Sequence, residues 1–481
     1  MIMKEKNNAR VSVIKIGAIY TISNVLVKGM AFLTTPLFTR LLSKAQYGDF
    51  SNISSWANII SIVVTLQLYV SIVRAKYDYA EEIDRYLSSI LVLGNIFTLI
   101  GWGIVESHSS FFQQFMDMDI VYIRIIFVYA LFSPAMQILI YKNRIYSQYK
   151  GVVCLTWLTL VTSTLGSLVL VVLMDDRLLG RTIGNYLLIA GVDIGLWFYI
   201  LVKGRCISPA YWKYALCFSV PLIPHELAGQ LLLSSDRIII KRLCGAEDAA
   251  LYSLAYTIST IASVLLSSMN QAWQPWLYDK MKEEDEKTIF RYTTPYTLLF
   301  AVGCIGIMLI GPEIVLVFGG TSYLEAQYVI PPVCMGIMLQ FLYTLYANIE
   351  FYEKKTGWIS TATLIAAGLN IALNFVMIPL FGYIAAAYTT AIGFAAMFLL
   401  HYWGVRLKTK YGKLYDLTKL MLIAGAVMIA TMMSLVLYQH AYIRYICIVL
   451  YLFTIVVIGW KYKERIIEIL KRGGKNGVKK A

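Results

Sequence analysis

The chain has 481 residues, of which 59% are apolar and only 15% are charged. Soluble globular domains carry about 25% charged residues, so this composition excludes an ordinary soluble protein, and its apolar content excludes a disordered one. The apolar residues suffice for about 14 membrane spans of roughly 20 residues each. The net charge of +14 does not indicate nucleic-acid binding, because the basic residues do not cluster on a soluble face. We therefore expect an all-α polytopic membrane protein.

Hydropathy along the chain predicts about fourteen transmembrane helices separated by short loops. The expected helices are 11–40, 47–73, 84–105, 120–140, 150–174, 179–202, 211–240, 248–272, 291–311, 326–350, 357–378, 382–403, 415–437 and 441–460.

The distribution of Lys and Arg predicts the orientation of these helices. With the N-terminus inside, 31 of the 42 basic residues lie in inner segments, eight lie in outer segments and three lie within spans. Cytoplasmic loops carry the excess of Lys and Arg in membrane proteins. We therefore expect both termini in the cytoplasm, an even number of spans, and a location in the bacterial inner (plasma) membrane.

The chain offers little to enzyme chemistry. Its seven cysteines show no CxxC spacing, its four histidines show no metal-ligand spacing, and no phosphate-binding loop of the GxxxxGK[ST] type occurs. The loops are too short for a soluble catalytic domain. We therefore expect no cofactor, no metal ion and no enzymatic activity. Short loops around many helices favour a secondary transporter.

A short internal repeat indicates two related halves. The pairs Arg40-Leu41 and Phe50-Ser51, separated by eight residues, recur 202 residues on as Arg242-Leu243 and Tyr252-Ser253 with the same separation. Because both copies follow a helix that runs outward, the repeat predicts two parallel six-helix lobes related by a pseudo-two-fold axis. The expected domains are 1–205 (helices 1–6), 206–405 (helices 7–12) and 406–481 (helices 13 and 14 with a basic tail).

Helices 1 and 7 carry polar and charged residues within the membrane. In helix 1, Asn24 and Lys28 share a face, and a lysine at mid-span requires a wet cavity or a partner. Helix 7 contains Pro221 and Pro224, which predict a kink or break near the midplane. Its ionisable residues are candidates for proton binding or ion pairing, the alternatives being a structural histidine and an interfacial ion pair. These residues are His225, Glu226, Asp236 and Arg237.

Polar stripes follow three further helices. Each stripe alone is more often contact between helices than a substrate path, whereas stripes on corresponding helices of both lobes favour a shared hydrophilic cavity. Arg124 and Asp193 either line this cavity or pair with each other. The stripes consist of Ser54, Asn58, Ser61 and Thr65 (ending near Arg74), of Tyr343, Tyr346 and Glu350, and of Thr363, Asn370 and Asn374.

Three motifs resemble those of the Wzx-type polysaccharide-export flippases. These transporters belong to the multidrug/oligosaccharidyl-lipid/polysaccharide exporter (MOP) superfamily, which also contains the multidrug extruders and the lipid II flippase. The matching segments are Pro36-Leu-Phe-Thr-Arg40 through Tyr47-Gly48, Ser235-Asp236-Arg237 followed by Leu251-Tyr252-Ser253, and Asn370 to Asn374 followed by Pro379 and Gly382.

The resemblance implies two six-helix bundles around a cavity that opens alternately to each side of the membrane. The implied cargo is an undecaprenyl-diphosphate-linked oligosaccharide moved from the inner to the outer leaflet. Where the lipid II flippase has arginines in helix 1, this chain has Asn24 and Lys28, which only partly supports a diphosphate contact there.

This cargo assigns roles to the charged and polar residues. A diphosphate requires cationic donors in a low-dielectric cavity, and the sugar requires amide and hydroxyl partners. The expected substrate-binding residues are Asn24, Lys28, Arg40, Arg74, Arg124, Asp236, Arg237, Asn370 and Asn374. The expected sites of coupling to H⁺ or Na⁺ are His225, Glu226 and Glu350.

The expected partners are membrane lipids, a polysaccharide polymerase and a chain-length regulator. Nucleic acid is not an expected partner. The nearest alternative is a cation-coupled multidrug antiporter of the same superfamily, in which carboxylates would dominate the cavity. A membrane-embedded polymerase or ligase is a further alternative, although such enzymes usually carry a large outer loop. A purely structural scaffold fits poorly with so many charges inside the membrane.

Overall fold

The computed structural model describes residues 29, 30 and 32–461, which form helices and turns and contain no strand. Residues 32–41 are helical and precede the labelled elements. In the N-terminal half these are α2 (Lys44–Thr65), η1 (Leu68–Ser71), α3 (Ile72–Asp78), α4 (Ile83–Ser107), α5 (Ser109–Met116), α6 (Ile120–Ile145), α7 (Tyr149–Leu173), α8 (Arg177–Thr182), η2 (Ile183–Leu187) and α9 (Leu188–Gly204).

The second half of the chain is helical in the same way. Its elements are α10 (Pro209–Ser219), η3 (Val220–Leu222), α11 (Ile223–Cys244), α12 (Ala246–Lys282), α13 (Glu286–Leu309), α14 (Gly311–Gly319), η4 (Thr321–Val329), α15 (Ile330–Tyr352), α16 (Thr356–Phe381), α17 (Ala385–Lys408), α18 (Leu417–Leu437) and α19 (Ala441–Lys461).

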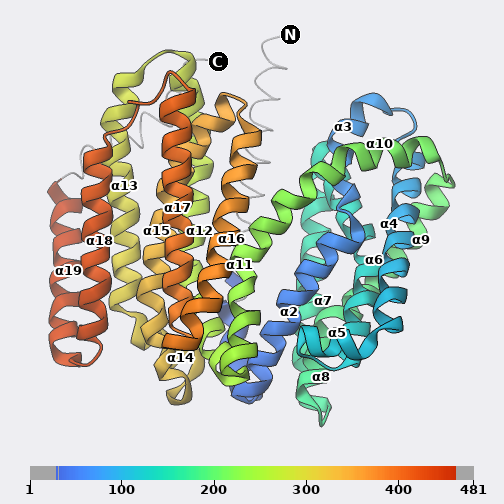
Figure 1. Cartoon of the computed structure of the whole chain (residues 1–481), viewed down its shortest axis with the longest axis horizontal. Coiled ribbons are helices and arrows are strands. Elements are labelled where there is room, and N and C mark those ends of the chain that lie inside the picture. The colour runs from blue at the N-terminus through green and yellow to red at the C-terminus, as the bar shows by residue number, and fades with distance from the viewer. Residues whose placement is uncertain (1–28, 31, 462–481) are drawn as a thin grey trace.

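The helices form two groups that meet along α2, α11 and α12 (Figure 1). The first group contains α4, α6, α7 and α9, and the second contains α12, α13 and α15 to α18. Helix α10 packs on α4 and η1, so the long α10–α11 segment begins on the first group and ends against the second. Helix α19 packs at the edge of the second group against α13 and α18.

The two copies of the sequence repeat meet at this contact. The hydroxyl oxygens of Ser51 and Ser253, which are equivalent in the repeat, lie 2.6 Å apart. Gly48 lies directly against α12, because a Cβ atom built on it would stand 1.8 Å from the carbonyl oxygen of Ala246. Small residues permit such close approach of membrane helices. Equivalent residues in mutual contact are what a pseudo-two-fold axis between α2 and α12 requires.

The number of membrane-spanning helices is lower than expected in the described part of the chain. Eleven helices are long and apolar enough to cross a membrane, or twelve when α2 is counted with the bent segment Leu68–Asp78. The last expected helix is present as a shorter apolar segment, Ala441–Val457. The first expected helix, 11–40, lies mostly outside the described residues. Fourteen therefore remains a prediction, whereas an all-helical, multi-pass membrane fold is confirmed.

The outer surface of the bundle is apolar. Leu299 and Leu422, for example, are 62% and 69% exposed. A soluble protein rarely exposes so many large apolar side chains, whereas a bilayer solvates them. This surface is the one expected to face lipid.

Helix α2 breaks where the sequence predicts a continuous helix over 47–73. Leu66 and Gln67 adopt left-handed conformations, with φ of 50° and 46°, and the chain bends by 56° before it continues. Non-glycine residues adopt this conformation at a cost of about 1–3 kcal/mol each, and such residues cluster at functional sites. No proline or glycine marks the break, so the sequence alone did not indicate it.

The predicted interruption of helix 7 is present as the 3₁₀ turn η3 at Pro221. This turn lies inside the long apolar segment Pro209–Cys244, and its depth in the membrane stays a prediction. Pro224 occupies the first turn of α11, where a missing N–H costs nothing.

Candidate functional site

A polar cavity of about 190 Å³ lies between α2, α6 and α11, where the two groups of helices meet. Hydroxyl and amide groups predominate in its wall, and none of the residues that line it carries a charge. The lining residues are Asn58, Ser61, Ile62, Thr65, Gln67, Tyr69, Tyr129, Ser133, Pro134, Gln137 and Gln230.

The stripe predicted on α2 forms one wall of this cavity. Asn58, Ser61 and Thr65 follow at steps of three and four residues, which places them on one face of the helix. The break at Leu66 then turns Gln67 into the same space. Tyr69, whose ring centroid is 4.8 Å from that of Tyr141, closes the wall. Neutral amides and hydroxyls both donate and accept hydrogen bonds, so this cavity suits a hydroxylated, uncharged group.

A second set of predicted residues forms a closed network around Asp236. The carboxylate, 1% exposed, accepts hydrogen bonds from Tyr252 Oη at 2.5 Å, Asn374 Nδ2 at 2.6 Å and Thr390 Oγ1 at 2.7 Å. Asn370 donates to Thr390 at 3.2 Å. The network joins α11, α12, α16 and α17. These residues lie together as the stripe suggested, but they do not line the polar cavity, and their predicted contact with substrate stays a prediction.

Glu350 of α15 lies against His401 of α17 in the core of the second group. Glu350 Oε2 is 2.6 Å from His401 Nδ1, and the two side chains are 1% and 0% exposed. The remaining atoms, Glu350 Oε1 and His401 Nε2, have no hydrogen-bond partner in the described structure. Tyr343 stacks on the imidazole ring at 5.4 Å. Gly404 leaves room for the carboxylate, because a Cβ atom there would lie 2.5 Å from Glu350 Oε1.

The remaining ionisable residues of predicted helix 7, apart from Asp236, lie in different surroundings. His225 is half-buried, and its Nδ1 has no hydrogen-bond partner among the described residues. Glu226 is exposed and interacts electrostatically with Tyr69 and Tyr141 beside the polar cavity. The guanidinium carbon of Arg237 lies 4.7 Å from the ring centroid of Tyr256. Within the described chain Arg237 forms no ion pair with Asp236.

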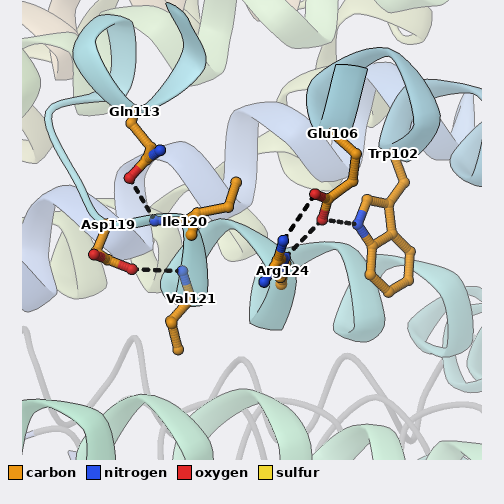
Figure 2. A network of polar contacts seen from close by, with 7 residues as sticks. All are labelled: Trp102, Glu106, Gln113, Asp119, Ile120, Val121 and Arg124. Carbon is orange, nitrogen blue, oxygen red and sulfur yellow. Dashed lines mark hydrogen bonds and ion pairs between the residues drawn. The ribbon is translucent and has the colours of Figure 1, made fainter. Parts of the chain in front are cut away.

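Arg40, Arg74 and Arg124, predicted to contact substrate, are exposed, and none of them lines the polar cavity. Arg74 pairs with Asp78 on α3 at 3.3 Å. Arg124 forms a two-pronged ion pair with Glu106, at 2.7 and 3.0 Å, and Trp102 donates to the same carboxylate (Figure 2). Arg124 is therefore not paired with Asp193.

Asp193 is fully buried, and neither carboxylate oxygen has a hydrogen-bond partner in the described residues. Asn24 and Lys28 lie outside those residues. Over the same residues, no group of three or more His, Cys, Asp or Glu side chains is placed to hold a metal ion.

Sequence reasoning missed several members of these sites. Gln67, Gln137 and Gln230 line the polar cavity although none belongs to a predicted stripe. His401 was not singled out, because a lone histidine in an apolar helix carries no periodic signal. The only available signal was that an ionisable side chain within a membrane span needs a partner, and Glu350 had none assigned.

The arrangement of two bundles of membrane helices with a polar cavity between them resembles that of solved membrane transporters. The chain has a TM-score of 0.55 with the inward-facing conformation of a multidrug resistance MATE family transporter of the MOP superfamily, at 15% identity over 80% of this chain and 93% of that one. For a MOP superfamily transporter from Pyrococcus furiosus the TM-score is 0.52, at 15% identity over 80% and 94%. The chain thus shares the fold of these two transporters.

The chain belongs to the polysaccharide biosynthesis protein family, which matches residues 13–281, more than half of its length. The family expected from the motifs is therefore confirmed. Among curated proteins, an uncharacterized membrane protein of Haemophilus influenzae is 23% identical over 74% of this chain and 88% of its own. A probable low-salt glycan biosynthesis flippase of Haloferax volcanii is also 23% identical, over 79% and 80%.

Proposed function

We propose that this protein moves undecaprenyl-diphosphate-linked oligosaccharides from the inner to the outer leaflet of the bacterial plasma membrane. The observation that carries the proposal is the neutral polar cavity at the contact of the two helix groups. Its amides and hydroxyls match the hydrogen-bonding pattern of a sugar. The family supports a glycan cargo, and so does the name of the Haloferax relative. The prenyl tail stays in lipid, outside the cavity.

The cavity also separates this function from the antiporter alternative. A site for cationic drugs requires a carboxylate to compensate the charge of the ligand, and none of the cavity's lining residues is acidic. We expect that cells producing the protein gain no resistance to cationic drugs such as ethidium. Resistance that depends on Glu226, the acidic residue beside the cavity, would favour the antiporter.

The direct test is leaflet-resolved detection of undecaprenyl-linked oligosaccharide in cells depleted of the protein. The oligosaccharide is expected to accumulate on the inner leaflet and to return to the outer leaflet on re-expression. Normal delivery in depleted cells without a second flippase would overturn the proposal.

The same assay tests the cavity. The double variant Asn58→Leu, Gln230→Leu removes two amides from opposite walls, and each lost hydrogen bond costs about 0.5–1.5 kcal/mol. Outer-leaflet delivery should fall about tenfold. Gln439→Leu, an exposed amide in the turn before α19, is the matched control and should leave delivery unchanged. Equal delivery by the double variant and this control, at equal protein levels, would exclude the cavity as the sugar site.

Alternating access requires contacts that close one side while the other is open. At the end of the molecule where α11 finishes and α2 begins, Lys241 Nζ lies 2.9 Å from Asp49 and 3.5 Å from the carboxylate of Asp117. It also donates to the backbone oxygen of Asp117 at 2.5 Å. These bonds join α11 to α2 and to the turn before α6. We infer that they hold the outer side closed.

Replacing Lys241 by Ala is therefore expected to shift the population toward an outward-open state. The lysine side chain is 11% exposed, and loss of about 1 kcal/mol corresponds to about a fivefold shift. Distance measurements between spin labels at the start of α2 and the start of α12 would report it as a larger outward-open fraction. Lys287→Ala, an exposed lysine after the opposite end of α12, is the control. An unchanged distance distribution in Lys241→Ala would exclude this contact as a gate.

Cycling against a gradient requires an ion site, and we assign it to the Glu350–His401 pair. An imidazole nitrogen binds a proton but is a poor ligand for Na⁺, so the pair favours H⁺ as the coupling ion. His225 and Glu226 are the alternative site, beside the cavity itself. A polysaccharide polymerase and a chain-length regulator are the proposed partners at the outer face.

The topology and the domain division are likewise proposals. The excess of Lys and Arg on one side supports cytoplasmic termini. The divisions proposed at 205/206 and 405/406 separate the two helix groups and the last two helices, with α10 packing back on the first group.

A further inference from the structure

A second cavity, of about 160 Å³, lies within the N-terminal group between the helical stretch 32–41, α7 and the α8–η2 segment. One arginine is the only charged residue among those that line it, the other polar ones are hydroxyls and an amide, and none is a carboxylate. The lining residues are Thr34, Phe38, Leu160, Ser163, Thr164, Ser167, Arg181 and Asn185.

The guanidinium group of Arg181 is held between aromatic rings. Its central carbon lies 3.9 Å from the ring centroid of Phe38 and 4.0 Å from that of Phe50, with Tyr47 at 5.2 Å. Aromatic rings attract the faces of a guanidinium group through cation–π interactions. Since the N–H bonds lie in the plane of the group, rings over its faces leave its edge available to a ligand.

No protein group described in the structure neutralises this arginine. Arg181 Nη1 is buried without a hydrogen-bond partner, and no carboxylate lies within 4 Å of the side chain in the described residues. Residues 11–28, the remainder of the first predicted span, contain no acidic residue in sequence. An ionisable side chain left unpaired in a membrane segment is costly and indicates a functional site.

The position of Arg181 along the chain sets its depth in the membrane. It is the fifth residue of α8, roughly 6 Å from the start of that helix at 1.5 Å per residue. The start of α8 is fixed next to the start of α2, because Arg177 Nη1 donates to the carbonyl oxygen of Leu41 at 2.6 Å. Lys241 contacts the same end of α2. The guanidinium group therefore lies close to the predicted outer face, at the level of lipid phosphates.

We propose that this cavity binds a phosphate group of a lipid. The edge of the Arg181 guanidinium binds two phosphate oxygens, and the Thr164 hydroxyl and the Asn185 amide donate to the others. The Ser163 hydroxyl donates to the carbonyl oxygen of Leu160 at 3.1 Å and joins these donors by rotating toward the phosphate. The phosphate has two possible sources, the diphosphate of the cargo after it crosses the membrane and the headgroup of an anionic phospholipid. The first source rests on the proposed function, whereas the second does not.

Binding to the purified protein in detergent tests the proposal with three probes measured by native mass spectrometry. Undecaprenyl diphosphate and phosphatidylglycerol carry a phosphate, and undecaprenol carries none. We expect Arg181→Gln to weaken undecaprenyl diphosphate binding about tenfold or more and to leave undecaprenol unaffected. Arg181→Lys keeps the charge but loses the two-pronged geometry, so its affinity should be intermediate. Arg85→Gln removes an exposed arginine paired with Glu82 and is the matched control.

The pattern across probes identifies the source of the phosphate. Loss confined to undecaprenyl diphosphate assigns the site to the cargo, and equal loss for phosphatidylglycerol assigns it to a phospholipid headgroup. Unchanged binding of both probes to a folded Arg181→Gln variant overturns the proposal, even where leaflet delivery shows the protein to be a flippase. Should that variant not fold, Ser163→Ala, Thr164→Val keeps the arginine and is expected to weaken binding of the phosphate probes several-fold, and no change there would also overturn it.

Discussion

Replacing Glu350 or His401 by Gln is expected to abolish the dependence of transport on a proton gradient. Both side chains are almost completely buried, and their contact joins α15 to α17 at 2.6 Å. Glutamine retains the size of the group and one hydrogen bond at each position, so the fold should persist while the titratable group is lost. Gradient-driven delivery in proteoliposomes should fall about 5- to 150-fold, the range of a coupling free energy of ~1–3 kcal/mol.

Glu353→Gln provides a control at the end of the helix that carries Glu350. Glu353 follows α15 directly and is only half-buried, so its replacement should leave both rate and pH dependence unchanged. Delivery by Glu350→Gln and His401→Gln with the wild-type response to pH would show that the pair is structural. The corresponding variants of His225 and Glu226 would then be the ones to test for coupling.

Replacing Asp236 by Ala is expected to destabilise the second helix group more than any other single change considered. Three buried donors, on Tyr252, Asn374 and Thr390, lose their common acceptor. Each unsatisfied buried donor costs about 1–3 kcal/mol, so the total is several kcal/mol. The thermal unfolding midpoint of the purified protein should fall by on the order of 5 °C or more.

The isosteric Asp236→Asn variant separates this network from a simple loss of charge. An amide oxygen still accepts hydrogen bonds, but the amide nitrogen opposes one of the three donors, so the fall in midpoint should be smaller than for alanine. Asp175→Ala removes an exposed carboxylate in the turn before α8 and should not change the midpoint. Equal midpoints for Asp236→Ala and Asp175→Ala would show that the network contributes no stability.

Local patterns predicted those parts of the site that lie on one helix. Asn58, Ser61 and Thr65 follow a helical period, and they line one wall of the cavity. Asn370 and Asn374 follow the same rule and meet one Asp236-centred network. Periodicity predicts which residues share one face of a helix, because the backbone fixes the geometry of the α-helix. Periodicity does not predict whether that face lines a cavity or packs against another helix. In the structure, Asn370 and Asn374 are packed between helices.

The sequence did not predict the surroundings of the cationic residues. Arg40, Arg74 and Arg124 were grouped by charge, yet they are exposed, none of them lines the polar cavity, and Arg124 is bound to Glu106 (Figure 2). Arg181 was not singled out by any motif or polar stripe, although its guanidinium group lies against the rings of Phe38 and Phe50. The sequence position of a charge near the end of a span is compatible with solvent, lipid or the interior of the bundle, and only the packing of neighbouring helices selects among them.

The sequence by itself determined the class of this protein. Long apolar segments, short loops and the one-sided excess of Lys and Arg leave only a multi-pass helical membrane protein, because an unpaired backbone cannot cross lipid. The sequence motifs indicated the family. Tertiary structure alone decided where α2 breaks, that Glu350 meets His401, and that a neutral cavity lies between α2, α6 and α11. These features involve contacts between residues that are far apart in the chain. A local sequence pattern contains no information about such contacts, so it could not predict them.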